Sequence, residues 1–360
     1  MNILFVYYVS SGGVETLNRQ RSSALKKKNI NCHFLYYQKV RELVNNHDAP
    51  TFITNDDNEI KTIINKGNYS AIIITSDYKS LPKFRSLGYQ GNIIWEIQGF
   101  GPKHIARSEL ANAIPYVTGY SNGILSSITP HIISLLNEFY PSFPKFIFHN
   151  CFDTSRFLYR ALPKVDSPII AWTGRIEDNK NWREFLQIGH QLIKVYNAAI
   201  KLYMFEDHTL SSPTERDEFN RLTKQLNLQN NLTIFSNVPN ERMADYFSMI
   251  GDSGGFLCST SKVEGFGYAI VEAMSCRCPV LSSDSDGVSS SIIHNQTGKF
   301  YSLGNISQAM NEGIDLMANH QLRESIRTQG TKHVTTLFTP EQYSTQFISM
   351  LNSLGINFQG

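Results

Sequence analysis

The chain has 360 residues, 41% of them hydrophobic and 18% charged, and this length predicts two domains of about 150 to 200 residues rather than one core. A net charge of only +2 argues against a general nucleic-acid binder. The sequence has no run of about 18 apolar residues and no basic-then-apolar leader, so we expect it to stay in the cytoplasm. Its five cysteines lack the spacing of a metal site, which favours a reducing compartment over a structural zinc.

In the first half, apolar β-branched runs alternate with stretches of helical periodicity. This pattern predicts a parallel sheet with crossover helices, in which the strands are buried on both faces. The strands that we expect here are 3–9, 32–37, 71–75, 92–97, 116–120 and 146–148.

Positive charge is concentrated in this first part of the chain. Residues 1–160 carry 17 Lys and Arg against 11 Asp and Glu, whereas the remaining residues carry 16 against 20. A run of three lysines at 26–28 follows Arg19 and Arg21, which predicts a positive stripe along one early helix. An ordinary solvated helix face is one interpretation. An anionic membrane surface or a phosphate-bearing acceptor is the other.

The second half repeats the α/β pattern after a segment with two prolines and no periodicity. We therefore expect an N-terminal domain over 1–160, a linker over 161–168 and a C-terminal domain over 169–340. A last helix over 341–358 either caps the second domain or joins the first. Two doubly wound sheets predict a ligand between them, at the carboxyl ends of the strands. The strands expected in the second sheet are 169–173, 201–205, 232–235, 255–258, 279–282 and 298–301.

The first expected strand leads into Gly12 and Gly13 and then a helix. Backbone amides at such a turn, with the helix dipole behind them, suit an anion or a closely approaching sugar, and a plain tight connection is the alternative. The surrounding sequence is neither the glycine fingerprint of a dinucleotide site nor a P-loop. A nicotinamide-dependent dehydrogenase is therefore the least favoured function.

The first strand of the second half leads into Gly174 and Arg175, with Lys180 at the start of the next helix. The two cations would converge with roughly the charge that offsets a diphosphate, and the glycine would let a phosphate approach closely. In the alternative, these cations pair with the nearby carboxylates of Glu177, Asp178 and Glu184.

Two glutamates stand eight positions apart, Glu264 in a glycine-rich turn and Glu272 in an apolar segment predicted to be helical. Burying a carboxylate is costly unless something hydrogen-bonds it, and a ligand rich in hydroxyl groups would meet that need. The spacing alone is expected by chance. Gly265, Gly267 and Pro279 around this apolar helix make a binding site the better interpretation.

Asp284 and Asp286 have the D-x-D spacing with which a metal-dependent sugar transferase holds a divalent cation on a diphosphate. This pair supports a competing hypothesis, a metal-dependent transferase of the other common fold. The histidines His104, His149 and His294 each stand alone without an i, i+4 partner, so they predict no metal site.

Together these motifs resemble the retaining glycosyltransferases of family 4, whose GT-B fold has two Rossmann-like, doubly wound parallel-sheet domains facing a central cleft. The resemblance covers nearly the whole chain in the right order, and its most specific part surrounds the two glutamates of the second half. The residues that carry it are Gly12, Gly13 and Glu15, the segment 149–153, Gly174, Arg175 and Lys180, and the stretch 264–272.

The resemblance implies that a sugar nucleotide lies in the second domain and that the first domain binds most of the acceptor. It implies that Arg175 and Lys180 grip the diphosphate, that Glu264 holds hydroxyls of the transferred sugar, and that Glu272 binds the ribose. Arg175, Lys180 and Glu264 are thus the expected catalytic residues. No metal or other cofactor is implied, because cations and helix termini neutralise the leaving group. Further donor contacts are implied for Gly12, Gly13, Gly174, Gly265, Phe266, Gly267 and Tyr268, and for Val238 and Pro239 near the base.

The sequence departs from the family pattern at several places. A histidine that is common after a strand of the first domain is replaced by Gln98, which can donate a hydrogen bond but cannot act as a general base. Gln98, and His104 if its loop folds back, are the expected contacts to the acceptor or the reacting sugar. Arg277 stands where a glycine is usual, and Asp286 with Gly287 replaces a common pair of glycines.

We therefore predict a retaining transfer of a hexose or N-acetylhexosamine from a nucleotide-diphosphate sugar, with UDP favoured over GDP. The expected acceptor is a glycan or a lipid-linked glycan in cell-surface polysaccharide synthesis, and the expected location is the cytoplasm, with peripheral binding to the inner face of the membrane. The leaving phosphate would take the acceptor's proton, so the protein would contribute positioning and charge stabilisation. The alternative is a catalytically inactive sugar-nucleotide-binding partner subunit or sensor.

Overall fold

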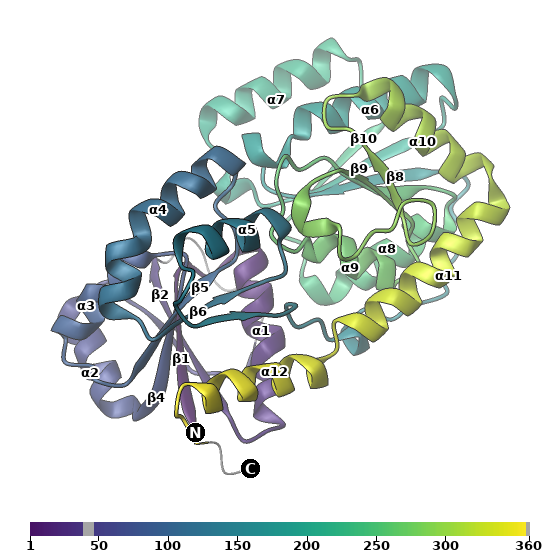
Figure 1. The fold of residues 1–360 in the computed structure, drawn as a ribbon. Helices are drawn as coiled ribbons and strands as arrows, with labels where there is room; N and C mark the ends of the chain where they lie inside the picture. Colours follow the sequence, from purple (N-terminus) through teal and green to yellow (C-terminus); the bar gives the residue numbers. More distant parts are fainter. Residues whose placement is uncertain (39–46, 358–360) are drawn as a thin grey trace. The chain divides into compact units, whose positions relative to one another are not determined.

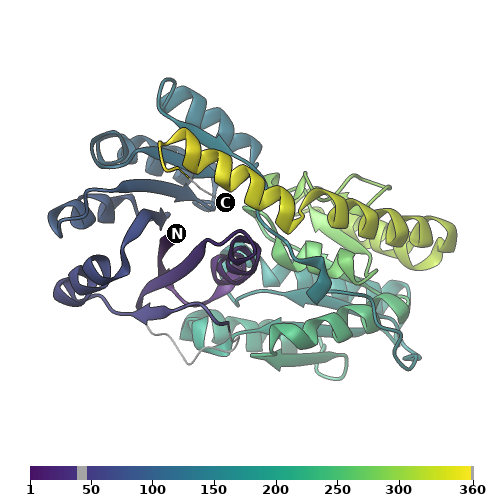
Figure 2. The same cartoon turned by 90° about the horizontal axis from the view of Figure 1, so that it is seen from below.

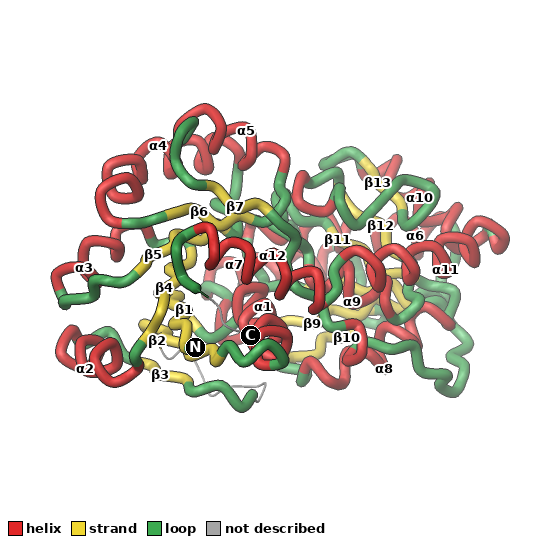
Figure 3. The backbone as a smooth tube through the Cα atoms, turned by 60° about the horizontal axis from the view of Figure 1, so that its bottom comes forward, coloured by secondary structure: helices red, strands yellow, loops and turns green. Residues whose placement is uncertain are grey.

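The structure, a computed structural model, describes residues 1–38 and 47–357. The chain divides into two compact units, unit 1 with Met1–Asp153 and Phe338–Gly360, and unit 2 with Thr154–Leu337. Each unit contains one parallel sheet flanked by helices, drawn in yellow and red in Figure 3. The prediction of two doubly wound parallel sheets is confirmed. No helix in the described part of the chain is long and apolar enough to cross a membrane.

Unit 1 contains a seven-stranded sheet with the order β3-β2-β1-β4-β5-β6-β7. Its central strands are continuous apolar runs, as in Ile72, Ile73 and Ile74, because helices cover both faces and leave these side chains fully buried. The strands are β1 (Asn2–Val9), β2 (Asn31–Gln38), β3 (Thr51–Ile53), β4 (Tyr69–Thr75), β5 (Asn92–Ile97), β6 (Gly123–Ser126) and β7 (Lys145–Ile147). The helices are α1 (Gly12–Lys26), α2 (Asp57–Gly67), α3 (Leu81–Ser86), α4 (Lys103–Tyr120), α5 (Pro130–Phe139) and α12 (Pro340–Ser353).

One expected strand of unit 1 is wrong. Residues 116–120 form the last part of α4, and the strand at this place in the sheet is β6, a few residues later. Helix α4 continues through Pro115, with Ala113 and Val117 packed in the core on either side of it. The short strand β3 was not expected at all.

The positive stripe expected along the first helix is also wrong, because both arginines point into unit 1. Arg19 Nε lies 2.7 Å from Glu15 Oε1, and both side chains are buried. Arg21 is fully buried, with Nη1 2.6 Å from Glu96 Oε1 and its guanidinium 3.8 Å above the Phe5 ring. Exposed positive charge on this helix is therefore reduced to the lysines at its end.

The last helix, α12, belongs to unit 1, where it packs against α1 (Figures 1 and 2). Its Phe347 ring lies 6.1 Å from Phe5 on β1, and Tyr343 stacks on Phe347 at 5.8 Å. Of the two placements considered for the helix over 341–358, the structure therefore has the one in the first unit. The helix ends at Ser353, and residue 358 lies outside the described residues.

Unit 2 contains a six-stranded sheet with the order β10-β9-β8-β11-β12-β13, and all of the predicted strands of this half are present. They are β8 (Ile169–Thr173), β9 (Lys201–Glu206), β10 (Leu232–Ser236), β11 (Phe256–Ser259), β12 (Val280–Ser283) and β13 (Lys299–Tyr301). The helices are α6 (Trp182–Val195), α7 (Pro213–Gln225), α8 (Asn240–Asp252), α9 (Tyr268–Ser275), α10 (Ile306–Ala318) and α11 (His320–Leu337).

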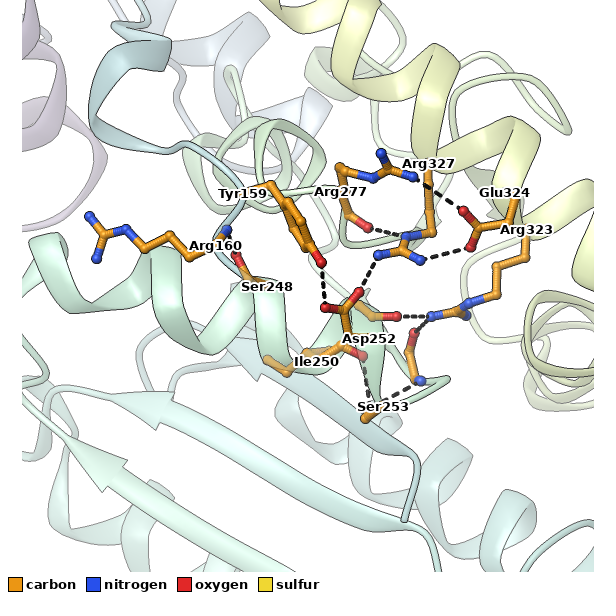
Figure 4. A network of polar contacts seen from close by, with 12 residues as sticks. Tyr159, Arg160, Ser248, Ile250, Asp252, Ser253, Arg277, Arg323, Glu324 and Arg327 are labelled. Carbon is orange, nitrogen blue, oxygen red and sulfur yellow. Dashed lines mark hydrogen bonds and ion pairs between the residues drawn. The ribbon is translucent and has the colours of Figure 1, made fainter. Parts of the chain in front are cut away.

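Unit 2 begins at Thr154, before the boundary that we expected at residue 160. Phe157 is buried, and the Tyr159 hydroxyl donates to Asp252 Oδ2 at 2.8 Å. The backbone N–H of Arg160 donates to Ser248 Oγ at 3.1 Å (Figure 4). These contacts with α8 attach the segment to unit 2, although its sequence carries no strand or helix pattern.

Side chains of α11 take part in the same network of polar contacts, as Figure 4 shows. Arg327 Nε donates to the Arg277 carbonyl at 2.8 Å, and Arg327 also pairs with Asp252. Arg277 has a φ of 59°, the left-handed region that favours glycine, the residue that the resemblance led us to expect here. Its side chain lies 3.2 Å from Glu324, an ion pair in which both partners are partly exposed.

Candidate active site

The loops that carry the predicted donor residues meet at one edge of the unit 2 sheet. Parallel strands all end on the same edge, and β8, β11 and β12 are consecutive in the sheet. The loop after β8 contains Gly174, Arg175 and Lys180, and the loop after β11 contains Glu264. The edge therefore brings residues far apart in the sequence into one region.

Lys180 and Glu264 are in direct contact. Lys180 Nζ lies 2.5 Å from Glu264 Oε1, and Ser261 Oγ donates to the same oxygen at 2.7 Å. The two side chains of the ion pair are 21% and 15% exposed, so water screens the pair less than it would on an open surface. Because an ammonium group has three donors, Lys180 can hold Glu264 and still donate to a phosphate.

Arg175 makes a different contact. Its Nη2 lies 3.0 Å from Glu177 Oε1, and its side chain is 47% exposed. This is the acidic pairing that the sequence left open for Arg175. Glu184, by contrast, accepts from Asn181 Nδ2 at 2.6 Å. The structure thus brings Lys180 to Glu264 but leaves Arg175 in a surface ion pair.

The turn after Glu264 packs closely against Gly287. The Gly287 N–H donates to the Glu264 carbonyl at 3.1 Å, and a Cβ on Gly287 would lie 2.1 Å from that oxygen and 2.5 Å from the Gly265 carbonyl. Glycine is therefore required at 287, even though its neighbour departs from the family pattern. Gly267, with a φ of +79°, then leads into α9, whose first backbone amides suit an anion.

Glu272 lies in α9 and is 5% exposed. A carboxylate buried to this degree needs hydrogen-bond partners, and Asn240 Nδ2 donates to its Oε1 at 3.2 Å. Asn240 is the first residue of α8, directly after Val238 and Pro239. The structure thus connects the carboxylate implied for the ribose with the segment implied for the base.

In unit 1, Gly12 opens α1 with a φ of +76°. A Cβ there would meet nothing within 4 Å, and both Gly12 and Gly13 are exposed. Open backbone at the start of a 15-residue helix suits an anion or a closely approaching ligand.

Gln98 lies in a partly buried polar network of unit 1. Its Nε2 donates to Glu96 Oε1 and to Asn150 Oδ1, both at 3.2 Å, and Asn150 Nδ2 donates back to Gln98 Oε1 at 2.7 Å. Both amide hydrogens of Gln98 are therefore engaged. His104 is exposed in the first turn of α4.

Asp284 and Asp286 lie in the segment that follows β12. Asp284 Oδ1 accepts from the backbone N–H of Leu303 at 3.3 Å. Across residues 1–38 and 47–357, no group of three or more His, Cys, Asp or Glu is placed to hold a metal ion.

Several polar partners at this edge were not predicted from the sequence. Most of them contact residues that are far away in the sequence, and a serine or an asparagine in a loop gives no signal by itself. The sequence did contain a run of hydroxyl residues at 259–261, shortly before Glu264, which is the one signal that could have been used. The unpredicted residues are Asn179, Asn240, Thr260, Ser261 and Lys262.

Two curated proteins are similar to about half of this chain. The chain is 21% identical over 184 residues to 2-deoxystreptamine N-acetyl-D-glucosaminyltransferase of Niallia circulans, covering 51% of this chain and 45% of that protein. It is 25% identical over 190 residues to the capsular polysaccharide biosynthesis glycosyltransferase CapM of Staphylococcus aureus, covering 52% and 47%. The chain thus spans about half the length of the curated relatives it matches.

Among solved structures, HepE of Anabaena in complex with UDP and glucose matches with a TM-score of 0.82 at 15% identity, over 98% of this chain and 100% of that one. At this identity the likeness shows the fold, with the two-sheet architecture of GT-B proteins. Residues 157–333, which include Lys180, Glu264 and Glu272, match the family model described as Glycosyl transferases group 1. Residues 157–333 therefore belong to the group 1 glycosyltransferases, the family to which the motifs of the chain pointed.

Proposed function

We propose that the chain is a retaining glycosyltransferase that moves a hexose or an N-acetylhexosamine from a nucleotide-diphosphate sugar to a glycan or lipid-linked acceptor. The observation that carries the proposal is the contact between Lys180 and Glu264 beside a glycine-rich turn, within the segment that matches the family. A cation suited to a diphosphate and a carboxylate suited to sugar hydroxyls stand within one hydrogen bond of each other.

In this proposal Lys180 and Arg175 stabilise the charge that develops on the diphosphate as it leaves. Arg175 is about half exposed and held in a surface ion pair, so it can change partner when the donor binds. Glu264 accepts hydrogen bonds from the transferred sugar, and the buried Glu272 accepts them from the ribose. The backbone amides of residues 265–267 complete the anion site at the start of α9.

The transfer takes place on one face of the sugar. The acceptor hydroxyl attacks the anomeric carbon from the side on which the diphosphate departs, the bond from that carbon to the phosphate oxygen breaks, and the leaving phosphate takes the proton. The configuration at the anomeric carbon is therefore retained. No side chain has to act as a base, which agrees with the non-titrating Gln98.

The relatives support the choice of donor and acceptor. HepE was solved with UDP and glucose, which favours a uridine nucleotide for this chain. The names of the two curated relatives refer to an N-acetylglucosaminyl transfer and to capsular polysaccharide biosynthesis. They favour a hexose or N-acetylhexosamine as the transferred sugar and a cell-surface glycan as the acceptor.

A second candidate function is a catalytically inactive protein that binds a sugar nucleotide as a partner subunit or sensor. Gln98 favours it, because both hydrogens of the amide are already engaged by Glu96 and Asn150. This candidate predicts binding of a UDP-sugar without transfer.

The test incubates the purified chain with UDP- and GDP-sugars and a panel of glycan acceptors, and follows nucleotide release and the anomeric configuration of the product by NMR. The proposal predicts UDP release, retention of configuration and full activity in excess EDTA. Thermal stabilisation by a UDP-sugar without release with any acceptor supports the second candidate. If the UDP- and GDP-sugars neither stabilise the chain nor release a nucleotide, both candidates are refuted. Activity abolished by EDTA supports the metal hypothesis built on Asp284 and Asp286.

A further inference from the structure

The hydroxyl of Thr260 is a junction between three segments of unit 2. Thr260 follows β11 directly and is completely buried. Its Oγ1 accepts from Trp172 Nε1 on β8 at 3.1 Å and lies 3.0 Å from both the Lys180 carbonyl and the Asn181 carbonyl. A hydroxyl has one proton and two lone pairs, so it can accept from the indole while its single proton is shared between the two carbonyls.

The Trp172 indole, which donates to Thr260, packs against the loop after β8. A Cβ on Gly174 would lie 2.9 Å from the Trp172 ring and 3.1 Å from Lys180 Cγ. The ring therefore packs directly against the backbone of Gly174, beside the stem of Lys180. A change in the orientation of the ring would displace both parts of this loop.

The backbone directly after Lys180 turns into the left-handed region. Asn181 has a φ of 50°, a conformation that asparagine adopts more readily than most residues other than glycine. The hydroxyl of Thr260 contacts the carbonyl of Asn181 itself.

Further contacts join the loop after β8 to the loop after β11. The Lys262 N–H donates to the Asn179 carbonyl at 2.8 Å, and Asn179 Nδ2 donates to the Val263 carbonyl at 3.1 Å. Lys262 Nζ lies 2.7 Å from Asp178 Oδ1. The Lys262–Asp178 ion pair is exposed, whereas Thr260 is completely buried.

We propose that Thr260 is a positioning residue for sugar transfer. Its hydroxyl fixes the backbone of Lys180 and Asn181 against the strand end that carries Ser261 and Glu264, so that the cation for the diphosphate and the carboxylate for the sugar keep one geometry. This inference rests on the proposed function. Thr260 itself touches neither the donor nor the acceptor.

The test compares Thr260→Val, which keeps the shape and removes the hydroxyl, with Thr260→Ser, which keeps the hydroxyl. Thr260→Val should lower kcat by about 10- to 100-fold, because displacement of a catalytic group by about 1 Å costs that much, and should weaken UDP binding less. Thr260→Ser should stay within about threefold of the wild type in both, since the hydrogen bonds remain. Rates are expressed per folded molecule, so that a merely structural role would leave kcat unchanged.

The matched control is Thr223→Val on α7, where the hydroxyl has no hydrogen-bond partner among the described residues. It should leave kcat and UDP binding unchanged. If Thr260→Val does not fold, Thr260→Cys, with a weaker hydrogen-bonding group of similar size, takes its place with the same expectation.

Wild-type kcat in Thr260→Val, or equal losses in Thr260→Val and Thr260→Ser, would overturn the inference alone. A wild-type chain that neither binds UDP nor transfers sugar would overturn the proposed function, and the inference with it.

Discussion

Replacing Gly287 by alanine should strongly impair transfer while the fold is kept. The added Cβ would lie 2.1 Å from the Glu264 carbonyl oxygen and 2.5 Å from that of Gly265, and real Cβ contacts essentially never fall below 3.0 Å. The backbone of the turn must therefore move by about 1 Å, a displacement that can cost about 100-fold in rate. The same overpacking should lower the free energy of unfolding by about 1–3 kcal/mol.

The assay is steady-state transfer from the best UDP-sugar, with urea unfolding measured in parallel. The control is Gly119→Ala in α4, where a Cβ meets nothing within 4 Å. This control should keep wild-type kcat and gain about 0.5–1 kcal/mol, because alanine is a better helix former than glycine. Wild-type kcat in a folded Gly287→Ala variant would refute the idea that the position of this turn governs catalysis.

Three other predictions concern stability. Glu96→Leu leaves the fully buried Arg21 without its carboxylate and should cost about 3–5 kcal/mol in urea unfolding, so a negligible loss would contradict the buried ion pair. Burial raises the pKa of Cys32 and Cys278 to about 12, so these thiols lose their protons more readily in the unfolded chain than in the folded one. The urea midpoint of unfolding should therefore fall as the pH rises from about 9 toward 12. A constant midpoint would count against the burial of these thiols. Arg277→Gly should change the free energy of unfolding by less than about 1 kcal/mol, because relief of the positive φ offsets the loss of an exposed ion pair, and a loss above about 2 kcal/mol would show that the arginine is a structural anchor.

Strand positions in unit 2 were predictable because a buried parallel strand is a short, continuous apolar run with turn residues on each side. The same reasoning failed at residues 116–120, where an apolar segment ends a helix instead. Periodicity over so few residues cannot separate the two structures, and the packing of α4 decided between them. The short strand β3 (Thr51–Ile53) has too few residues to carry a pattern.

Charges were harder to predict than strands. Arg21 and the three lysines at 26–28 look alike in the sequence, yet Arg21 is buried because Glu96, far along the chain, provides its partner. The candidate site shows the same limit. The sequence assigned Lys180 and Glu264 to one donor site but did not predict their ion pair. The role of Thr260 depends on contacts with β8 that a single sequence does not encode locally.

The central claim is that Lys180 contributes to binding the diphosphate of a sugar nucleotide. Calorimetric titration of UDP and uridine into the wild type and Lys180→Ala tests this claim most directly. In the wild type UDP should bind at least about 10-fold more tightly than uridine, since a charge-assisted hydrogen bond contributes about 1.5–3 kcal/mol, and Lys180→Ala should remove most of that difference. Equal affinities for UDP and uridine in the wild type, or an unchanged difference in Lys180→Ala, would contradict the claim.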